Sequence, residues 1–260
     1  MNFLSNAHTH TPYCDGRSTI AEQVAAARSL GFVSLGFSGH AMQGFDWKYC
    51  MSVEGQRAYA TELRSLQRES AENGLMPKLY VGLEEDSLVP AAEKAKNRAE
   101  FDYRIGSTHY FPETLHGEWV AMAEAYYTLH GATVERDRPD VIGHFDLVRK
   151  YAQQLGLDTG SAGYRSAALD ALTQARRGCA LLEVNTGGIA RGYETAPFPA
   201  GFLLDAWREM GGEVTLTSDC HDARYLDCAF AETAVMLKSR GFAHALRLGT
   251  GDALWEEVAL

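Results

Sequence analysis

Two histidines and an aspartate near the start of the chain have a spacing suited to metal binding. His8 and His10 are separated by one residue, and Asp15 follows within the same short stretch. If the two histidines lie on a β-strand, their imidazoles point to the same face, because side chains repeat every two residues along a strand. Two neutral imidazoles that converge at a strand end are good metal ligands. The H-x-H pattern is a weak signal when taken alone, so its meaning depends on the rest of the chain.

Further side chains of the same kinds occur where apolar, strand-like runs end. They are His40, Glu84, His109, His144, Asp219 and His221. In a β/α barrel the carboxyl ends of all strands lie on one face, and active sites are built there. Together with His8, His10 and Asp15 they give nine candidate ligands, and three or four ligands per ion then indicate two or three divalent metal ions. Glu84 is expected to bridge two of these ions, with Glu85 as the alternative.

The chemistry of such a centre is hydrolytic. Mixed imidazole and carboxylate ligands suit zinc, manganese or iron. Clustered divalent ions lower the pKa of a bound water and stabilise the charge that develops on a phosphoryl group, so we expect a phosphate ester as the substrate. Arg191, Arg17 and Arg224 follow strand ends, where a guanidinium could hold two phosphate oxygens. Asn185 could orient a water or a substrate group, or it could stabilise a turn.

Seven strand-then-helix units account for most of the chain. The predicted strands cover residues 2–10, 32–38, 78–83, 103–108, 141–143, 180–184 and 213–217. The predicted helices cover residues 19–30, 52–73, 89–100, 119–133, 166–177, 199–210 and 227–240. Thr19 and Glu22 form a capping box if Thr19 is the N-cap of the first helix. Such alternation predicts an α/β fold with a parallel sheet, and we expect a distorted (β/α)7 TIM-like barrel, with an eight-stranded barrel as the alternative. Residues 241–260 have no assignment.

Size and charge narrow the class of protein. The chain has 260 residues, of which 46% are hydrophobic, so one domain over residues 1–260 is expected. A formal net charge of −10 argues against a nucleic acid or an anionic membrane as partner. The expected partner, a small-molecule phosphate ester, would need local positive charge, which bound metals could supply. A homo-oligomer is left open.

Several features predict a cytoplasmic protein. The first residues, MNFLSNAHTH, have neither the basic nor the apolar segment of a secretory signal. The sequence also contains no run of about 18 apolar residues, so no membrane span is expected. The five cysteines form no C-x-x-C pair and are expected to be reduced thiols.

The ordered set of motifs resembles the PHP (polymerase and histidinol phosphatase) family. The matching segments are HTHT at 8–11, DG at 15–16, FSGH at 37–40, GLE at 82–84, GSTH at 106–109, GHFD at 143–146 and SDCH at 218–221. Within the family, the chain is most similar to histidinol-phosphatase. The features that suggest this are the GFS segment before His40 and the EVNT segment at 183–186, which is followed by Gly188 and Arg191.

The resemblance implies a site with three groups of metal ligands. The groups would be His8, His10, Glu84 and Asp219; Glu84, His109 and His144; and Asp15, His40 and His221. It also implies hydrolysis of L-histidinol phosphate to L-histidinol and phosphate, late in histidine biosynthesis. A hydroxide held between the metals would attack phosphorus, with Glu84, Asp219 and His221 as catalytic residues and Arg191 on the phosphate.

Two alternatives compete with this assignment. One is a PHP phosphoesterase that acts on another ester, such as a nucleotide or a sugar phosphate. The other is a metal-stabilised module without catalysis, as PHP domains attached to polymerases can be. Because this chain has a suitable residue at all nine ligand positions, the enzyme is favoured over the module.

Overall fold

The predicted strand–helix units form a parallel sheet whose strands follow the order of the chain. The structure, a computed structural model, describes residues 3–44, 48–109, 119–152 and 156–260. Within these ranges, a seven-stranded sheet has the order β1 to β7. The strands are β1 (Ser5–Asn6), β2 (Ser34–Phe37), β3 (Lys78–Asp86), β4 (Tyr103–Ser107), β5 (Val141–Ile142), β6 (Leu181–Asn185) and β7 (Glu213–Thr217). All six strand pairs are parallel, which confirms the predicted α/β barrel with seven rather than eight strands.

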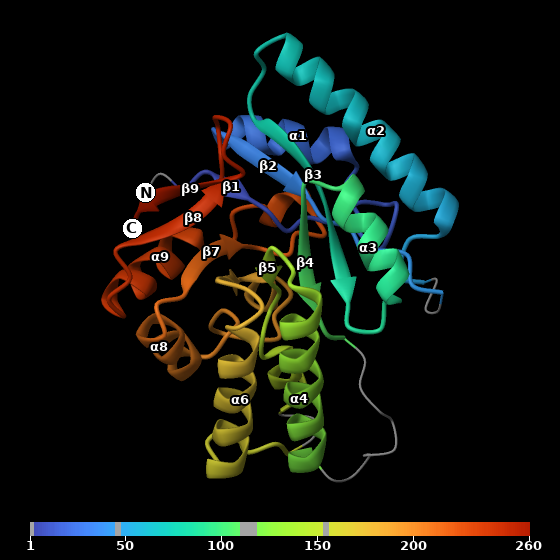
Figure 1. Cartoon of the computed structure of the whole chain (residues 1–260). Helices are drawn as coiled ribbons and strands as arrows, with labels where there is room; N and C mark the ends of the chain where they lie inside the picture. Colours follow the sequence, from blue (N-terminus) through green and yellow to red (C-terminus); the bar gives the residue numbers. More distant parts are fainter. Residues whose placement is uncertain (1–2, 45–47, 110–118, 153–155) are drawn as a thin grey trace.

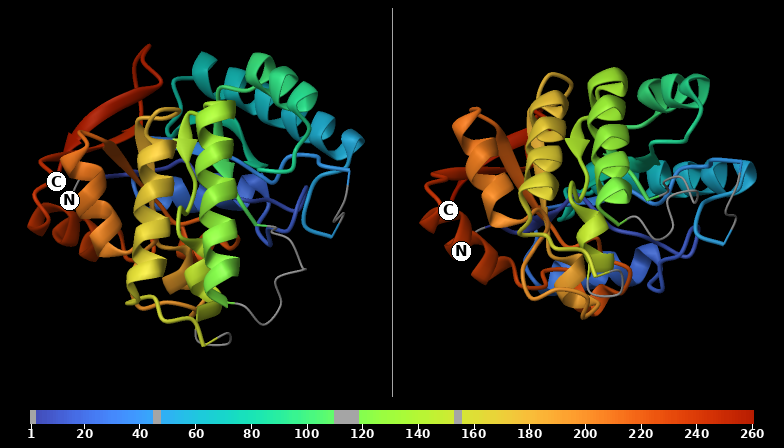
Figure 2. Two further views of the ribbon diagram at one scale, coloured as in Figure 1. Left: turned by 60° about the horizontal axis from the view of Figure 1, so that its bottom comes forward. Right: turned by 90° about the horizontal axis from the view of Figure 1, so that it is seen from below.

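Helices surround the sheet (Figure 1). They are α1 (Ile20–Ser29), α2 (Val53–Glu72), α3 (Ala91–Glu100), α4 (Trp119–Asp137), α6 (Ala162–Ala175), α7 (Gly187–Ala190), α8 (Gly201–Glu209) and α9 (Phe230–Ser239), with short 3₁₀ helices η2 (Leu147–Tyr151) and η3 (Ala223–Tyr225). Helices α4 and α6 lie side by side in both views of Figure 2 and pack against each other. No helix in the described ranges is long and apolar enough to cross a membrane.

The first helix begins as the sequence predicts. The Thr19 hydroxyl accepts a hydrogen bond from the Glu22 backbone N–H, and the Glu22 carboxylate accepts one from the Thr19 backbone N–H at 2.8 Å. This reciprocal pair satisfies two backbone donors that the start of a helix otherwise leaves free. Gly31 follows the helix with a φ of +74°, a conformation that glycine adopts at little cost.

The segment that carries His8 and His10 is the main departure from the expected strands. The ladder of β1 ends at Asn6, well before His10. Residues 8–10 bond instead to two neighbouring segments. The Cys220 N–H donates to the His8 carbonyl at 2.9 Å, the His10 N–H donates to the Cys220 carbonyl at 2.8 Å, and the Ser38 N–H donates to the Thr9 carbonyl. The segment therefore links the ends of β2 and β7 and nearly closes the barrel there.

Residues 241–260, which the sequence left unassigned, contain an antiparallel hairpin of β8 (His244–Leu248) and β9 (Trp255–Ala259). The hairpin packs near the amino-terminal ends of the strands β2 and β3. The Ser34 hydroxyl donates to the Leu248 carbonyl at 2.6 Å, and the Tyr80 hydroxyl donates to the Gly249 carbonyl at 2.7 Å. The hairpin thus covers the end of the barrel opposite to the predicted site.

Candidate metal centre

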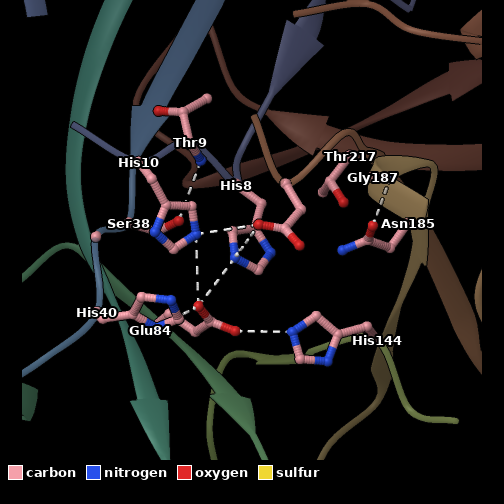
Figure 3. A network of polar contacts seen from close by, with 12 residues as sticks. His8, Thr9, His10, Ser38, His40, Glu84, His144, Asn185, Gly187 and Thr217 are labelled. Carbon is pink, nitrogen blue, oxygen red and sulfur yellow. Dashed lines mark hydrogen bonds and ion pairs between the residues drawn. The ribbon is translucent and has the colours of Figure 1, made fainter. Parts of the chain in front are cut away.

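All nine predicted metal ligands meet at the carboxyl end of the barrel. Figure 3 shows His8, His10, His40 and His144 directed toward Glu84. His8 and His10 are fully buried, and their ring centroids are 5.1 Å apart, as expected for side chains on one face of an extended segment. His40 follows β2, His109 follows β4 and His144 follows β5. The sheet therefore brings together residues that are more than 100 positions apart in the chain.

Glu84, on β3, is at the centre of this cluster and is only 1% exposed. Its Oε2 atom is 3.3 Å from His8 Nε2, 3.5 Å from His10 Nε2 and 2.9 Å from His40 Nδ1. Its Oε1 atom is 3.3 Å from His109 Nε2 and 2.9 Å from His144 Nε2. Each carboxylate oxygen thus faces a different set of imidazoles, which is the arrangement of a carboxylate that bridges two cations.

The alternative to Glu84 faces elsewhere. Glu85, the next residue on β3, accepts hydrogen bonds from Asn97 at 2.8 Å and from Arg104 at 3.1 Å. Successive side chains on a strand point to opposite faces, so only one of the two adjacent glutamates can reach the histidines. The structure places Glu84 in that position.

The group around His8 has the spacing of ligands on one ion. Asp219 Oδ1 is 3.6 Å from His8 Nε2 and 3.1 Å from His10 Nε2. Atoms bonded to one tetrahedral zinc at roughly 2.0–2.2 Å are about 3.4 Å apart, so these distances, and those to Glu84, match a shared ion. His8, His10 and Asp219 also form one of the sets whose ligand atoms all lie within 4.8 Å of one another.

Two further sets meet the same criterion among the described residues. One contains His10, Asp15, His40 and His221, and the other contains His40, Glu84 and His109. The first set includes the predicted third group, in which Asp15 is 3.1 Å from His221 and 3.7 Å from His40. His40 belongs to both sets because it lies between Asp15 and Glu84, so the division of the nine ligands among ions stays a prediction.

Unpartnered polar atoms provide an independent test of whether these residues fit a metal. Buried polar atoms are nearly always hydrogen-bonded. Here His8 Nε2, His10 Nε2, Asp15 Oδ1 and Glu84 Oε2 are buried and have no hydrogen-bond partner. All four atoms point into the cluster, and all are of types that ligate divalent cations. The residues therefore fit a metal centre.

Electrostatics in the cluster favours bound cations. Burial raises the pKa of Glu84, but the histidines around it, led by His40 and His8, lower it more, so the pKa lies well below its usual range. Burial lowers the pKa of His109, yet Glu84 and Asp86 outweigh this effect and raise it to about 10. The lowered pKa of Glu84 favours its charged form, and a buried carboxylate attracts positive charge, which divalent ions can supply.

The predicted phosphate contacts lie in different places. Arg191 Nη2 is 2.5 Å from Asp219 Oδ2, and its Nη1 atom is 3.0 Å from His221 Nδ1. Arg191 also lines a cavity of about 390 Å³, together with seven of the candidate ligands and aromatic residues that include Tyr49, Tyr151 and Tyr193. Its guanidinium is therefore at the site, beside two ligands.

The other three predicted contacts, Arg17, Arg224 and Asn185, are not part of the described lining of this cavity. The exposed guanidinium of Arg224 pairs with Asp222 at 2.6 Å. Arg17 is exposed, and its backbone N–H donates to the His221 carbonyl at 2.7 Å. Asn185 is fully buried, and its amide bridges the Gly187 N–H at 2.8 Å and Glu183 at 3.0 Å. The Asn185 contacts match its alternative role as a stabiliser of the turn after β6, and the substrate contacts of all three residues stay predictions.

Two carboxylates that were not selected from the sequence contact the sides of candidate ligands that face away from Glu84. Glu183 binds His8 Nδ1 at 2.5 Å, and Asp86 accepts from the His109 N–H at 2.8 Å and lies 3.2 Å from His109 Nδ1. One signal was available in the sequence, since Glu183 interrupts the apolar strand LLEVN, and carboxylates are almost never fully buried without a partner. Cys220, between Asp219 and His221, donates instead to the Asp222 carbonyl at 3.1 Å.

Comparisons with known proteins agree with this description. The family model of the PHP domain matches residues 6–187. A proposed histidinol phosphatase from Listeria monocytogenes has a similar structure, with a TM-score of 0.75 and 18% identity over 88% of this chain and 99% of that one. The histidinol phosphate phosphatase of Lactococcus lactis, solved with zinc, L-histidinol and phosphate, has a TM-score of 0.67 and 19% identity over 94% of this chain and 95% of that one. No curated protein matches the chain.

Proposed function

Because this chain belongs to the PHP domain family, we propose that it is a metal-dependent phosphomonoesterase that hydrolyses L-histidinol phosphate to L-histidinol and phosphate. The observation that carries the proposal is the single buried carboxylate of Glu84 with five histidine nitrogens within 3.5 Å of its two oxygens. A structural role would not require so many ionisable side chains with unpartnered atoms beside an open cavity.

Two or three divalent ions, with zinc, manganese and iron as candidates, would be held by the nine ligands. When bound, they would supply a water of lowered pKa and positive charge for the phosphoryl oxygens. Glu84 would contribute one carboxylate oxygen to each of two neighbouring groups of ligands. Asp219 and His221, which follow β7, would contribute the remaining catalytic side chains. Arg191 would contribute donors to the phosphate, because it lines the cavity beside Asp219.

The cavity also supports a substrate with a ring. Tyr49, Tyr151 and Tyr193 line it, so a planar imidazole could stack on an aromatic face. The Lactococcus protein of similar fold binds histidinol and phosphate, which supports the same substrate here. A second candidate rests on Lys150, whose Nζ atom lies 5.0 and 5.3 Å from the Tyr151 and Tyr193 ring centroids and could pair with a further anionic group of a nucleotide or sugar phosphate.

The test is phosphate release by the zinc-loaded protein from L-histidinol phosphate, a nucleoside monophosphate and a sugar phosphate. We expect histidinol phosphate to be hydrolysed well ahead of the others. A preference for the nucleotide or the sugar phosphate would replace the substrate assignment and leave the phosphoesterase intact. Asp219→Asn should abolish turnover and keep the fold by circular dichroism, and unchanged activity in this variant would overturn the metal-dependent mechanism.

Other properties also belong to the proposal. We propose that residues 1–260 form one domain, and that the protein acts in the cytoplasm on a small molecule rather than on a nucleic acid or a membrane. Light scattering of the purified protein will measure whether it forms a homo-oligomer.

A further inference from the structure

A second buried carboxylate, Glu183, lies directly behind the metal ligands. It is fully buried on β6, with no solvent contact that could stabilise its charge. Its stabilisation comes from four hydrogen-bond donors, and two of them belong to candidate ligands. Figure 3 shows these two, His8 and His144, with Thr217 and Asn185, on neighbouring strands and loops.

The four donors are divided between the two carboxylate oxygens. Oε1 is 2.5 Å from His8 Nδ1 and accepts from the Thr217 hydroxyl at 2.6 Å. Oε2 accepts from the His144 backbone N–H at 2.6 Å and from the Asn185 amide at 3.0 Å. An ionised carboxylate is the side chain that can accept all four bonds, because it has two acceptor oxygens and no donor.

The contact with His8 determines which ring nitrogen can bind a metal. When Nδ1 donates its hydrogen to Glu183, Nε2 of the neutral ring keeps a free lone pair. That Nε2 atom is 3.3 Å from Glu84 and 3.6 Å from Asp219 and has no hydrogen-bond partner. A carboxylate that holds the far nitrogen of a ligating histidine in this way is a common support of metal sites.

The contact with His144 acts on a different group of ligands. Glu183 fixes the main chain of His144, and the His144 ring then places Nε2 2.9 Å from Glu84 Oε1. His8 faces the other oxygen of Glu84. One carboxylate on β6 therefore positions a histidine on each side of the bridging carboxylate on β3.

We propose that Glu183 is a positioning residue that couples the two metal sites sharing Glu84 and leaves the group of Asp15, His40 and His221 unaffected. The inference rests on the proposed metal binding. Within the described part of the chain, the hydrogen bonds of Glu183 go to His8, His144, Asn185 and Thr217, and none goes to that third group. Asp15 contacts His40 and His221, and His221 also contacts Arg191.

Asp86 offers a matched comparison. It is also a buried carboxylate behind the ligands, but it supports only His109, through the His109 N–H and Nδ1. Removing the charge of Asp86 should therefore weaken one site, whereas removing the charge of Glu183 should weaken two. Glu135 on α4 binds Gln174 and Arg177 and makes no contact with the site, so it provides the neutral control.

The experiment compares Glu183→Gln, Asp86→Asn and Glu135→Gln with the parent chain. Gln keeps the shape of Glu183 but places an amide NH₂ against two of the four donors. Each metal-free protein is titrated with Zn²⁺ in a calorimeter and with Co²⁺, followed by its visible absorption. We expect Glu183→Gln to weaken two sites by roughly 10–100-fold and keep one, Asp86→Asn to weaken one site by a similar factor, and Glu135→Gln to match the parent.

The melting temperatures of the metal-free proteins distinguish a role of Glu183 in stabilising the fold from a role in positioning metal ligands. If Glu183 only stabilises the fold, its variant melts lower without metal and still binds every ion with parental affinity, which overturns the proposal. Weakening of all sites alike would also overturn it. If Glu183→Gln does not fold, Thr217→Val provides the test. This variant removes the hydroxyl that shares Glu183 Oε1 with His8, so it should weaken metal binding at the His8 site alone. Metal affinities equal to those of the parent would contradict the inference.

Failure of this inference can be told from failure of the proposed function. A parent chain that binds no Zn²⁺ or Co²⁺ refutes the metal centre itself. A parent that binds metal and hydrolyses histidinol phosphate, with a Glu183→Gln variant of unchanged affinities, refutes only the role of Glu183.

Discussion

The two ends of the barrel differ in how their polar groups are satisfied. At the carboxyl end, four buried ligand atoms have no hydrogen-bond partner, and ionised carboxylates crowd together with histidines. At the opposite end, Ser34 and Tyr80 donate to carbonyls of the hairpin segment, and Tyr103 donates to the Ala7 carbonyl at 2.5 Å. The carboxyl end therefore keeps buried polar atoms without hydrogen-bond partners, whereas the hydroxyl groups named at the opposite end are all hydrogen-bonded.

Packing follows the same division. Tyr103 is fully buried inside the barrel, where Gly36 and Gly82 leave room for its ring: a Cβ atom at Gly82 would lie 2.5 Å from Tyr103 Cζ. Trp255 of the hairpin meets the Tyr103 ring edge-on, with centroids 6.0 Å apart. Barrels commonly separate a stabilising end from a catalytic end, and this chain does so by using aromatic packing at one and ionisable side chains at the other.

The largest expected effect comes from Glu84→Gln at the carboxyl end. The amide loses one charge and one acceptor between two groups of ligands, so we expect kcat to fall by about a thousandfold, equivalent to about 4 kcal/mol of transition-state stabilisation. The assay is phosphate release at saturating substrate and metal. The neighbouring Glu85→Gln should keep turnover per folded molecule, because Glu85 faces Asn97 and Arg104. Equal losses in both variants would contradict the central role of Glu84.

At the hairpin end, Leu248→Ala should affect stability and leave catalysis intact. Leu248 is fully buried, and truncation of such a side chain costs about 3 kcal/mol. Denaturant unfolding of the metal-free protein measures the loss, while kcat/KM below the unfolding transition should equal that of the parent. A fall in metal affinity in this variant would show that the two ends are not independent.

Removal of metal should destabilise the protein through the carboxyl end alone. An ion at 100 times its dissociation constant stabilises the folded state by about 2.7 kcal/mol per site, which corresponds to a melting temperature higher by roughly 5–10 °C. We expect chelation to lower the melting temperature and Zn²⁺ to restore it. The same increment should appear in Leu248→Ala and shrink in Glu84→Gln. A melting temperature that does not respond to metal would argue against the centre.

The smallest effect is expected at the cap of α1, where the contacts of Thr19 with Glu22 are exposed and involve none of the nine candidate ligands. Thr19→Ala removes the hydroxyl that binds the Glu22 backbone N–H and should lower the free energy of unfolding by about 1 kcal/mol. Thr19→Ser keeps the hydroxyl and should behave like the parent. Activity should not change in either variant, so a catalytic defect in Thr19→Ala would extend the functional region to the start of α1.

Local sequence patterns were sufficient to predict much of the fold. The limits of β7 coincide with the predicted 213–217, and the capping box of α1 is present, because both depend on residues that are close in the chain. The nine candidate ligands could be selected because each lies near the carboxyl end of a strand or in the loop that follows it. In a parallel barrel, the position at a strand end already implies the shared rim.

Other features depend on residues that are distant in the chain. The early end of β1 follows from the bonds of residues 8–10 to Cys220 and Ser38, and the hairpin of residues 241–260 has its place only because the barrel offers a surface to cover. The role of Glu183 depends on the assembly of β7 and the segments that follow β1 and β5 around β6.

By itself, the sequence determined which side chains could ligate a metal and which strand would carry each. Only the tertiary structure decided which oxygen of Glu84 faces which imidazole, that Asn185 bonds to its own turn, and that Arg191 lies against Asp219. The physical reason is that the strands follow from local periodicity, whereas ligand geometry depends on how the closed barrel directs each side chain toward partners on other strands, from 25 positions away for Glu84 and His109 to 206 for Asp15 and His221.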